Sequence, residues 1–263
     1  MENPFMKMKL DWRKGAQENA AAQYSLSKEL AKKEEGAKKA IEETLRLIEG
    51  AGSAVRNEGE KAKAAPKMKR KREWHEKFKW FFTSGGKLVV AGRDAKQNDY
   101  LVAKVMHDDD LFFHADIQGA PATILVGGGK ASGQEKNEAA QFAASHSSAW
   151  KVGAAAVDVY AVRKEQLSKH AHGGFIGSGG FAIDGEREWF RSTKLELAAG
   201  ADEGVFTCIP AVHPKAASFK FMVEMGRDEK GKAARFLARE LSVAQDDVLS
   251  NLPSGCLSIK KRS

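Results

Sequence analysis

The densest polar cluster of the sequence, GRDAKQND at residues 92–99, lies where an apolar segment typical of a strand gives way to an amphipathic segment typical of a helix. Backbone N–H groups at the start of a helix, together with the guanidinium of Arg93, can bind a phosphate group. The cluster also fits a structural role, in which Asp94 caps the helix and Arg93 pairs with a nearby acidic side chain. The motif alone leaves both interpretations open.

A second polar cluster, HADIQG at residues 114–119, follows the apolar run LFF. Strand alternation places His114 and Asp116 on one face, where Asp94 could join them in a common pocket. Such a trio can bind a divalent metal or act as general acid and base, which makes a metal-dependent phosphodiesterase or nuclease one alternative. The other is a buried hydrogen-bonded network between two strands. Since the sequence has no HExxH motif and no nucleophile with a matching base, it predicts no catalytic residue, no metal site and no cofactor.

A basic stretch precedes these clusters. The formal net charge is +8, and nearly all of the excess lies in residues 61–79, which carry nine Lys or Arg and two Asp or Glu. The most closely spaced basic residues are Lys67, Lys69, Arg70, Lys71 and Arg72. Dense positive charge favours the binding of a polyanion through counterion release, so this stretch predicts a contact with nucleic acid. The alternative is a solvated basic linker.

The elements that must position these residues begin with a long helix. Residues 11–49 are rich in Ala, Glu, Lys and Leu, and their apolar positions follow helical spacing in a narrow stripe, which predicts a coiled-coil-like arm or a solvated helix. Gly50 and Gly52 are the predicted stop. From Trp74 onward, short apolar runs such as WHEKFKWFF, KLVVAG and AAAVDVYAV predict strands, with helices after residue 97 and around residues 139–150.

The tail contains one strand-like run, FKFMVEM, and then a predicted helix over residues 228–241. Ser242 with Gln245 resembles a capping box that opens a last short helix. Strands with interspersed helices and no regular βαβ repeat predict an α+β fold. We expect a helical coiled-coil-like arm at 1–65, a basic linker at 66–79, a mixed α+β domain at 80–200 and a small α/β tail at 201–263.

Composition narrows the classes of protein further. Two cysteines, Cys208 and Cys256, cannot form a disulfide framework or a four-thiolate zinc site. No run of 18 apolar residues occurs, and the first residues lack the layout of a signal peptide. We therefore expect a cytoplasmic protein without a membrane partner.

Several motifs in order resemble the NFACT family of ribosome quality control proteins. WHEKFKWFFTSGGKLVVAGRDAKQN, LFFHADIQGAPATI, EAAQFAASHSSAWK, DVYAVRKEQLSK and GSGGFAIDG, over residues 74–190, are similar to the family's NFACT-R domain. The arm is similar to the coiled-coil segment before that domain, and the tail resembles a reduced NFACT-C region. The stretch at residues 168–174, SKHAHGG, departs from the family because it lacks the Pro and Glu that the family usually has there.

The resemblance implies a non-enzymatic RNA-binding protein that associates with the large ribosomal subunit or tRNA during rescue of stalled ribosomes. It assigns Arg93, Lys96 and Lys169 as phosphate or RNA contacts, oriented by Asp94 and Asp116. The other matching motif residues are Gln97, Asn98, His114, Gln166 and Ser168, of which Asn98 is a further RNA-binding candidate. Because no NFACT-N domain precedes the arm, we expect that the chain cannot add C-terminal tails alone. An NFACT-N protein supplied separately, self-association through the arm, and a coiled-coil adaptor role remain open.

Overall fold

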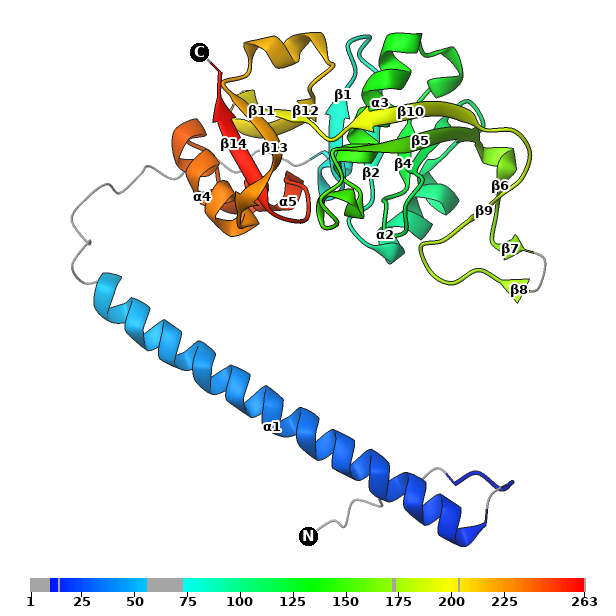
Figure 1. Ribbon diagram of the computed structural model, residues 1–263, viewed down its shortest axis with the longest axis vertical. Helices are drawn as coiled ribbons and strands as arrows, with labels where there is room; N and C mark the ends of the chain where they lie inside the picture. Colours follow the sequence, from blue (N-terminus) through cyan, green and yellow to red (C-terminus); the bar gives the residue numbers. More distant parts are fainter. Residues whose placement is uncertain (1–9, 14, 56–72, 172–173, 203, 263) are drawn as a thin grey trace. The chain divides into compact units, whose positions relative to one another are not determined.

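The computed structural model describes residues 10–13, 15–55, 73–171, 174–202 and 204–262, and it divides into two compact units, Met1–Arg70 and Lys71–Ser263 (Figure 1). The α+β fold class predicted from the sequence is confirmed, since a long helix precedes antiparallel sheets with interspersed helices. No helix among the described residues is both long and apolar enough to cross a membrane.

In the first unit, a single helix, α1 (Ala16–Val55), occupies most of the described residues. Its exposed surface carries i,i+4 ion pairs such as Glu29–Lys33, with N–O distances of 2.7 Å, which support an isolated helix modestly. The prediction that Gly50 and Gly52 stop the helix is wrong, because α1 continues to Val55. A glycine inside a helix costs only about 1 kcal/mol relative to alanine, so it need not end one. The coiled-coil character of the arm stays a prediction.

The second unit is built on a six-stranded antiparallel sheet with the strand order β1-β2-β4-β3-β5-β10. The strands are β1 (Lys79–Phe82), β2 (Leu88–Ala91), β3 (Leu111–Ala115), β4 (Thr123–Leu125), β5 (Ala156–Arg163) and β10 (Glu188–Lys194). Residues 74–77, predicted as the start of a strand, instead form the 3₁₀ helix η1 (Trp74–Lys77). A capping box between Glu73 and Glu76 stabilises this helical turn. The turn therefore forms even though the aromatic residues favour a strand.

Both faces of this sheet are buried. Strand alternation sends Phe113 toward the helix α3 (Gly133–Ser145), whereas Phe112 packs on the opposite face with residues of the π-helical turn η2 (Leu101–Val105), which continues the helix α2 (Ala95–Tyr100). The helices predicted after residue 97 and near residue 139 are thereby present. Trp150, predicted to share the face of α3, lies instead in the separate turn η4 (Ser148–Trp150).

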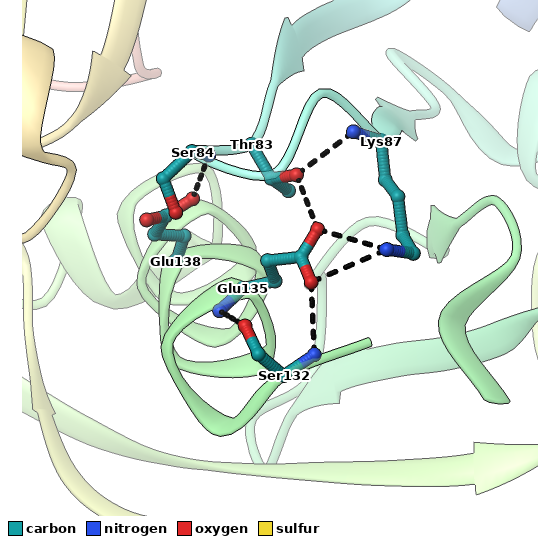
Figure 2. A network of polar contacts seen from close by, with 6 residues as sticks. All are labelled: Thr83, Ser84, Lys87, Ser132, Glu135 and Glu138. Carbon is teal, nitrogen blue, oxygen red and sulfur yellow. Dashed lines mark hydrogen bonds and ion pairs between the residues drawn. The ribbon is translucent and has the colours of Figure 1, made fainter. Parts of the chain in front are cut away.

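A polar network fixes the β1–β2 turn to the start of α3 (Figure 2). Glu135 accepts hydrogen bonds from the Ser132 N–H (2.8 Å) and the Thr83 hydroxyl (2.9 Å) and pairs with the Lys87 ammonium at 3.1 Å. The neighbouring Glu138 accepts from the Ser84 N–H at 2.8 Å. Burial alone would raise the pKa of Glu135, but these donors outweigh it and hold the pKa at about 2. The carboxylate therefore stays ionised and ties two elements together.

The C-terminal part forms a four-stranded antiparallel sheet with the order β12-β11-β13-β14, where the sequence predicted one strand. Its strands are β11 (Leu197–Asp202), β12 (Val205–Pro210), β13 (Phe221–Asp228) and β14 (Leu257–Lys261), with the turn η6 (Pro214–Ser218) and the helices α4 (Lys230–Leu241) and α5 (Gln245–Asn251). One hydrophobic core runs from Phe81 through Leu197 to Leu257. The expected domain boundary at residue 200 thus falls inside β11.

The predicted capping box of Ser242 with Gln245 is wrong. Ser242 ends α4 in a left-handed conformation with φ of 54°, and Ala244 is the N-cap of α5 without a side-chain hydrogen bond. The remaining short elements lie mainly around residues 128–183. They are η3 (Gly128–Lys130), η5 (Lys164–Gln166), β6 (Leu167–Ser168), β7 (His170–Ala171), β8 (Gly174–Phe175) and β9 (Ala182–Ile183), with β6 paired to β9 and β7 to β8.

Candidate functional site

A cavity of about 580 Å³ lies where β2 and β3 end and where β1 begins. Its lining comes from both sides of the sheet. The contributing segments are the residues after β2, the start of α2, the end of α3 and the glycine-rich loop at residues 177–180. Four predicted site residues line it, namely Arg93, Asp94, Asn98 and His114. Six other predicted residues do not line it, namely Lys96, Gln97, Asp116, Gln166, Ser168 and Lys169.

Arg93 and Asp94 both support the start of α2. The Asp94 carboxylate accepts a hydrogen bond from the Gln97 N–H at 2.8 Å, which makes it the N-cap. The Arg93 guanidinium donates to the carbonyls of Phe78 (2.9 Å) and Glu76 (3.3 Å). The capping interpretation of Asp94 is therefore confirmed. Arg93 remains largely exposed beside the cavity, while its guanidinium also holds the segment that leads into β1.

Asn98 is buried and joins α2 to the sheet. Its side-chain oxygen accepts from the Ala122 N–H at 3.1 Å, and Ala122 in turn accepts from the Gly92 N–H. A Cβ atom at Gly92 would lie 2.1 Å from the Asn98 oxygen, so only glycine fits at this position. The geometry gives Asn98 a positioning role at the wall of the cavity.

Lys169 is held in an ion pair beside the cavity. Its ammonium lies 2.5 Å from Asp99 Oδ1 and 2.7 Å from the Gly180 carbonyl, and Asp99 also accepts from the Ser178 hydroxyl and the Gly179 N–H. Burial would raise the pKa of Asp99, but the hydrogen bonds from Lys169, Ser178 and Gly179 lower it overall. Lys169 and Asp99 thus fasten the glycine-rich loop to α2.

Replacing Asp99 with asparagine is expected to loosen this loop, because it removes the charge that Lys169 pairs with. Partly exposed ion pairs contribute little, so we expect a loss of about 1 kcal/mol in unfolding free energy. The measurement is amide hydrogen exchange, which should become faster at Gly179. Glu188→Gln, which removes the Lys136 pair at the surface, is the control and should leave the loop unchanged. Unaltered exchange in the Asp99 variant would contradict this role.

His114 also lines the cavity, where it lies against the aromatic rings of Tyr160 and Phe112. The Tyr160 hydroxyl is 3.4 Å from His114 Nδ1, and the His114 and Phe112 rings are stacked with centroids 6.1 Å apart. Burial lowers the pKa of His114, although backbone hydrogen bonds and the charge of Asp116 act in the opposite direction. Tyr160 also contacts Arg187, whose guanidinium lies 4.7 Å from the ring centroid.

The trio Asp94, His114 and Asp116 does not form a metal site. Asp94 caps α2, and Asp116 is exposed beyond the end of β3 and does not line the cavity. Among the residues that the structure describes, no group of three or more His, Cys, Asp or Glu side chains is placed to hold a metal ion. Among the described residues, these three side chains therefore do not converge on one site.

Three further motif residues have structural or surface positions. Gln166 donates to the carbonyls of Asp184 (2.9 Å) and Glu186 (2.6 Å), and Ser168 accepts from the His170 N–H. Lys96 is exposed on α2. The basic residues Lys67, Lys69, Arg70, Lys71 and Arg72 lie outside the described residues.

The cavity also contains two buried residues that the sequence reasoning missed, Lys79 and His146. Lys79 is the first residue of β1, and burial followed by the charges of Lys230 and Arg93 lowers its pKa to about 7. His146 is the C-cap of α3, and burial followed by the charge of Lys79 moves its pKa well below its usual value. One signal could have revealed Lys79, because in the strand KWFF it alternates with the buried Phe81 and so shares the inward face.

Comparison with known proteins places this geometry in a family. Residues 77–185, which include most of the cavity lining, match the NFACT protein RNA binding domain. The chain is 39% identical over 206 residues to an archaeal Rqc2 homolog, aRqcH, of Methanocaldococcus jannaschii, an alignment that covers 74% of this chain and 31% of that protein.

Two eukaryotic relatives have related names. The ribosome quality control complex subunit NEMF homolog of Drosophila melanogaster is 32% identical over 68% of this chain and 18% of its own length. Ribosome quality control complex subunit 2 of Schizosaccharomyces pombe is 31% identical over 76% of this chain and 20% of its own length. The chain thus spans less than a third of the length of these curated relatives. With its RNA-binding domain matched at residues 77–185 and these relatives aligned over most of the chain, the protein belongs to the NFACT family.

Proposed function

We propose that this protein binds RNA in ribosome-associated quality control, in contact with the large ribosomal subunit or with tRNA in the cytoplasm. The observation that carries the proposal is the match of residues 77–185 to the NFACT RNA binding domain, which coincides with a cavity lined by cationic and aromatic side chains. The names of the relatives refer to ribosome quality control, and they support the assignment of the protein to this process. The proposal assigns no reaction to the chain.

The RNA contact is assigned to two groups of basic residues. The stretch with Lys67, Lys69, Arg70, Lys71 and Arg72 supplies the sequence-independent attraction to phosphates, because it concentrates charge directly before the RNA-binding domain. Arg93 and Lys96, both exposed at α2, add contacts beside the cavity. Lys169, fixed by Asp99, serves chiefly to position the glycine-rich loop at this surface. Further partners that we propose are a separate NFACT-N protein and a second copy of the chain, which would pair through α1.

The test measures binding of the purified chain to tRNA and to large ribosomal subunits over a salt series. A variant with Lys69, Arg70, Lys71 and Arg72 changed to alanine is expected to bind tenfold or more weakly at low salt and with a shallower salt dependence, because fewer counterions are released. A matched control changes four exposed basic residues elsewhere, Lys194, Lys220, Arg227 and Arg235, to alanine.

The control should bind nearly as well as the unmodified chain. If the unmodified chain binds neither tRNA nor large subunits at low salt, the proposed function is wrong. If both variants lose the same affinity, the attraction depends on net charge alone and the basic stretch is not the contact.

A further inference from the structure

Two chemically different groups of side chains line the cavity. Lys79, Arg93 and Lys151 bring positive charge to it, while Phe112, Tyr160 and Phe181 supply aromatic surface. A nucleotide has the same two parts, since its phosphate is anionic and its base stacks on aromatic rings. The volume of about 580 Å³ lies in the range of small-molecule sites.

Lys79 is buried, with only 7% of the residue exposed, and it has no acidic partner among the described residues. The groups whose charges act on it are Lys230, Arg93 and the Cys208 thiol. Burial raises the pKa of that thiol to about 12, so Cys208 is neutral and cannot balance the lysine. A buried cation without a counter-charge destabilises the free protein, and an anionic ligand would remove that cost.

His146 provides a second unsatisfied group in the same cavity. It is 5% exposed, and neither of its ring nitrogens has a hydrogen-bond partner among the described residues. Buried polar atoms in folded proteins are nearly always hydrogen-bonded, so the unpaired imidazole of a residue that lines the cavity is a candidate contact for a bound partner. Because its pKa is well below the usual value, the ring is neutral and offers one N–H donor.

We propose that the cavity binds one nucleotide of the RNA, with its phosphate at Lys79 and His146 and its base against the aromatic wall. This inference rests on the proposed function and names a subsite within it. Lys79 supplies the charge, the neutral His146 donates its N–H to a phosphate oxygen, and Arg93 lies at the rim. An aromatic wall accepts any base by stacking, so the site favours an accessible nucleotide with little preference for its identity.

The experiment titrates the full chain with inorganic phosphate, 5′-AMP and adenosine, using calorimetry and chemical shifts of the His146 ring. We expect 5′-AMP to bind more tightly than either phosphate or adenosine, because it engages both parts of the cavity. Lys79→Met should weaken binding of both phosphate and 5′-AMP by about tenfold or more. Lys220→Met, at an exposed position, is the matched control and should leave both unchanged.

A second pair of variants tests the two subsites separately. Phe181→Leu should weaken 5′-AMP several-fold and leave phosphate unchanged, whereas His146→Gln should weaken both ligands. Absence of phosphate and 5′-AMP binding in a chain that still binds tRNA would overturn the nucleotide site and leave the proposed function intact. Equally tight binding of a short acidic peptide would identify a carboxylate site for a protein ligand and also overturn the proposal.

Discussion

Replacing Lys79 with methionine is expected to raise the free energy of unfolding by about 2–4 kcal/mol at pH 6, even though the substitution removes a charged group from the cavity lining. Methionine fills a similar volume without the charge, so packing against Phe81 and the sheet is retained. The gain arises because the folded protein no longer buries an ammonium that has no acidic partner among the described residues.

The pH dependence of this gain follows from the lowered pKa. In the unfolded chain Lys79 titrates near its ordinary value, whereas in the folded chain its pKa is about 7. Below pH 7 both states hold the proton and the burial cost is fully present. Between pH 7 and about 10 the folded state gives up its proton first, so the stability of the unmodified protein rises toward that of the variant.

Urea denaturation of both proteins at pH 6 and pH 9.5, without phosphate in the buffer, measures this difference. Lys220→Met, at an exposed position, should change stability by less than about 0.5 kcal/mol and without pH dependence. A Lys79→Met protein that is less stable at pH 6, or a difference that does not shrink with pH, would show that the ammonium makes a favourable contact.

Replacing Glu135 with glutamine is the second large change, with an expected loss of about 2–3 kcal/mol at pH 7. The carboxylate accepts from Ser132 and Thr83 and pairs with Lys87, and glutamine keeps the shape but loses the charge and one acceptor (Figure 2). Because the capping box and the β1–β2 turn depend on the same carboxylate, the substitution weakens both the start of α3 and its contact with the sheet.

The lowered pKa of Glu135 predicts where this stabilisation disappears. It is fully present above the ordinary pKa of a glutamate and is lost as pH falls toward about 2, because the folded carboxylate must then accept a proton. Thermal unfolding at pH 7, 4 and 3 should show the two proteins converging as pH falls. Asp202→Asn, which breaks the exposed pair with Lys215, is the control and should cost less than about 1 kcal/mol. A constant difference at all three pH values would contradict the assignment.

The sequence alone determined the fold class, the long helix and the family. The continuous apolar runs in LFFHA and KLVVAG are typical of strands buried on both faces, and the ordered series of motifs is specific enough to identify the NFACT-R domain. Local chemistry also made the cap at Asp94 one of two interpretations, because a carboxylate before a helix binds the free N–H groups of its first turn, and the structure confirms it. The strands, the long helix and the cap depend on residues within a few positions of each other, and the family depends on the order of motifs along the chain.

Only the tertiary structure decided which distant side chains meet. Lys79 and His146 line one cavity from β1 and from the end of α3, and Lys169 pairs with Asp99, a contact that the motifs did not predict. Residue spacing reports which face of an element a side chain occupies, but it contains no information on strand order or on the helix that covers that face. Alternation along β1 indicates the inward face of Lys79, but the buried surroundings that lower its pKa arise from the packing of distant elements.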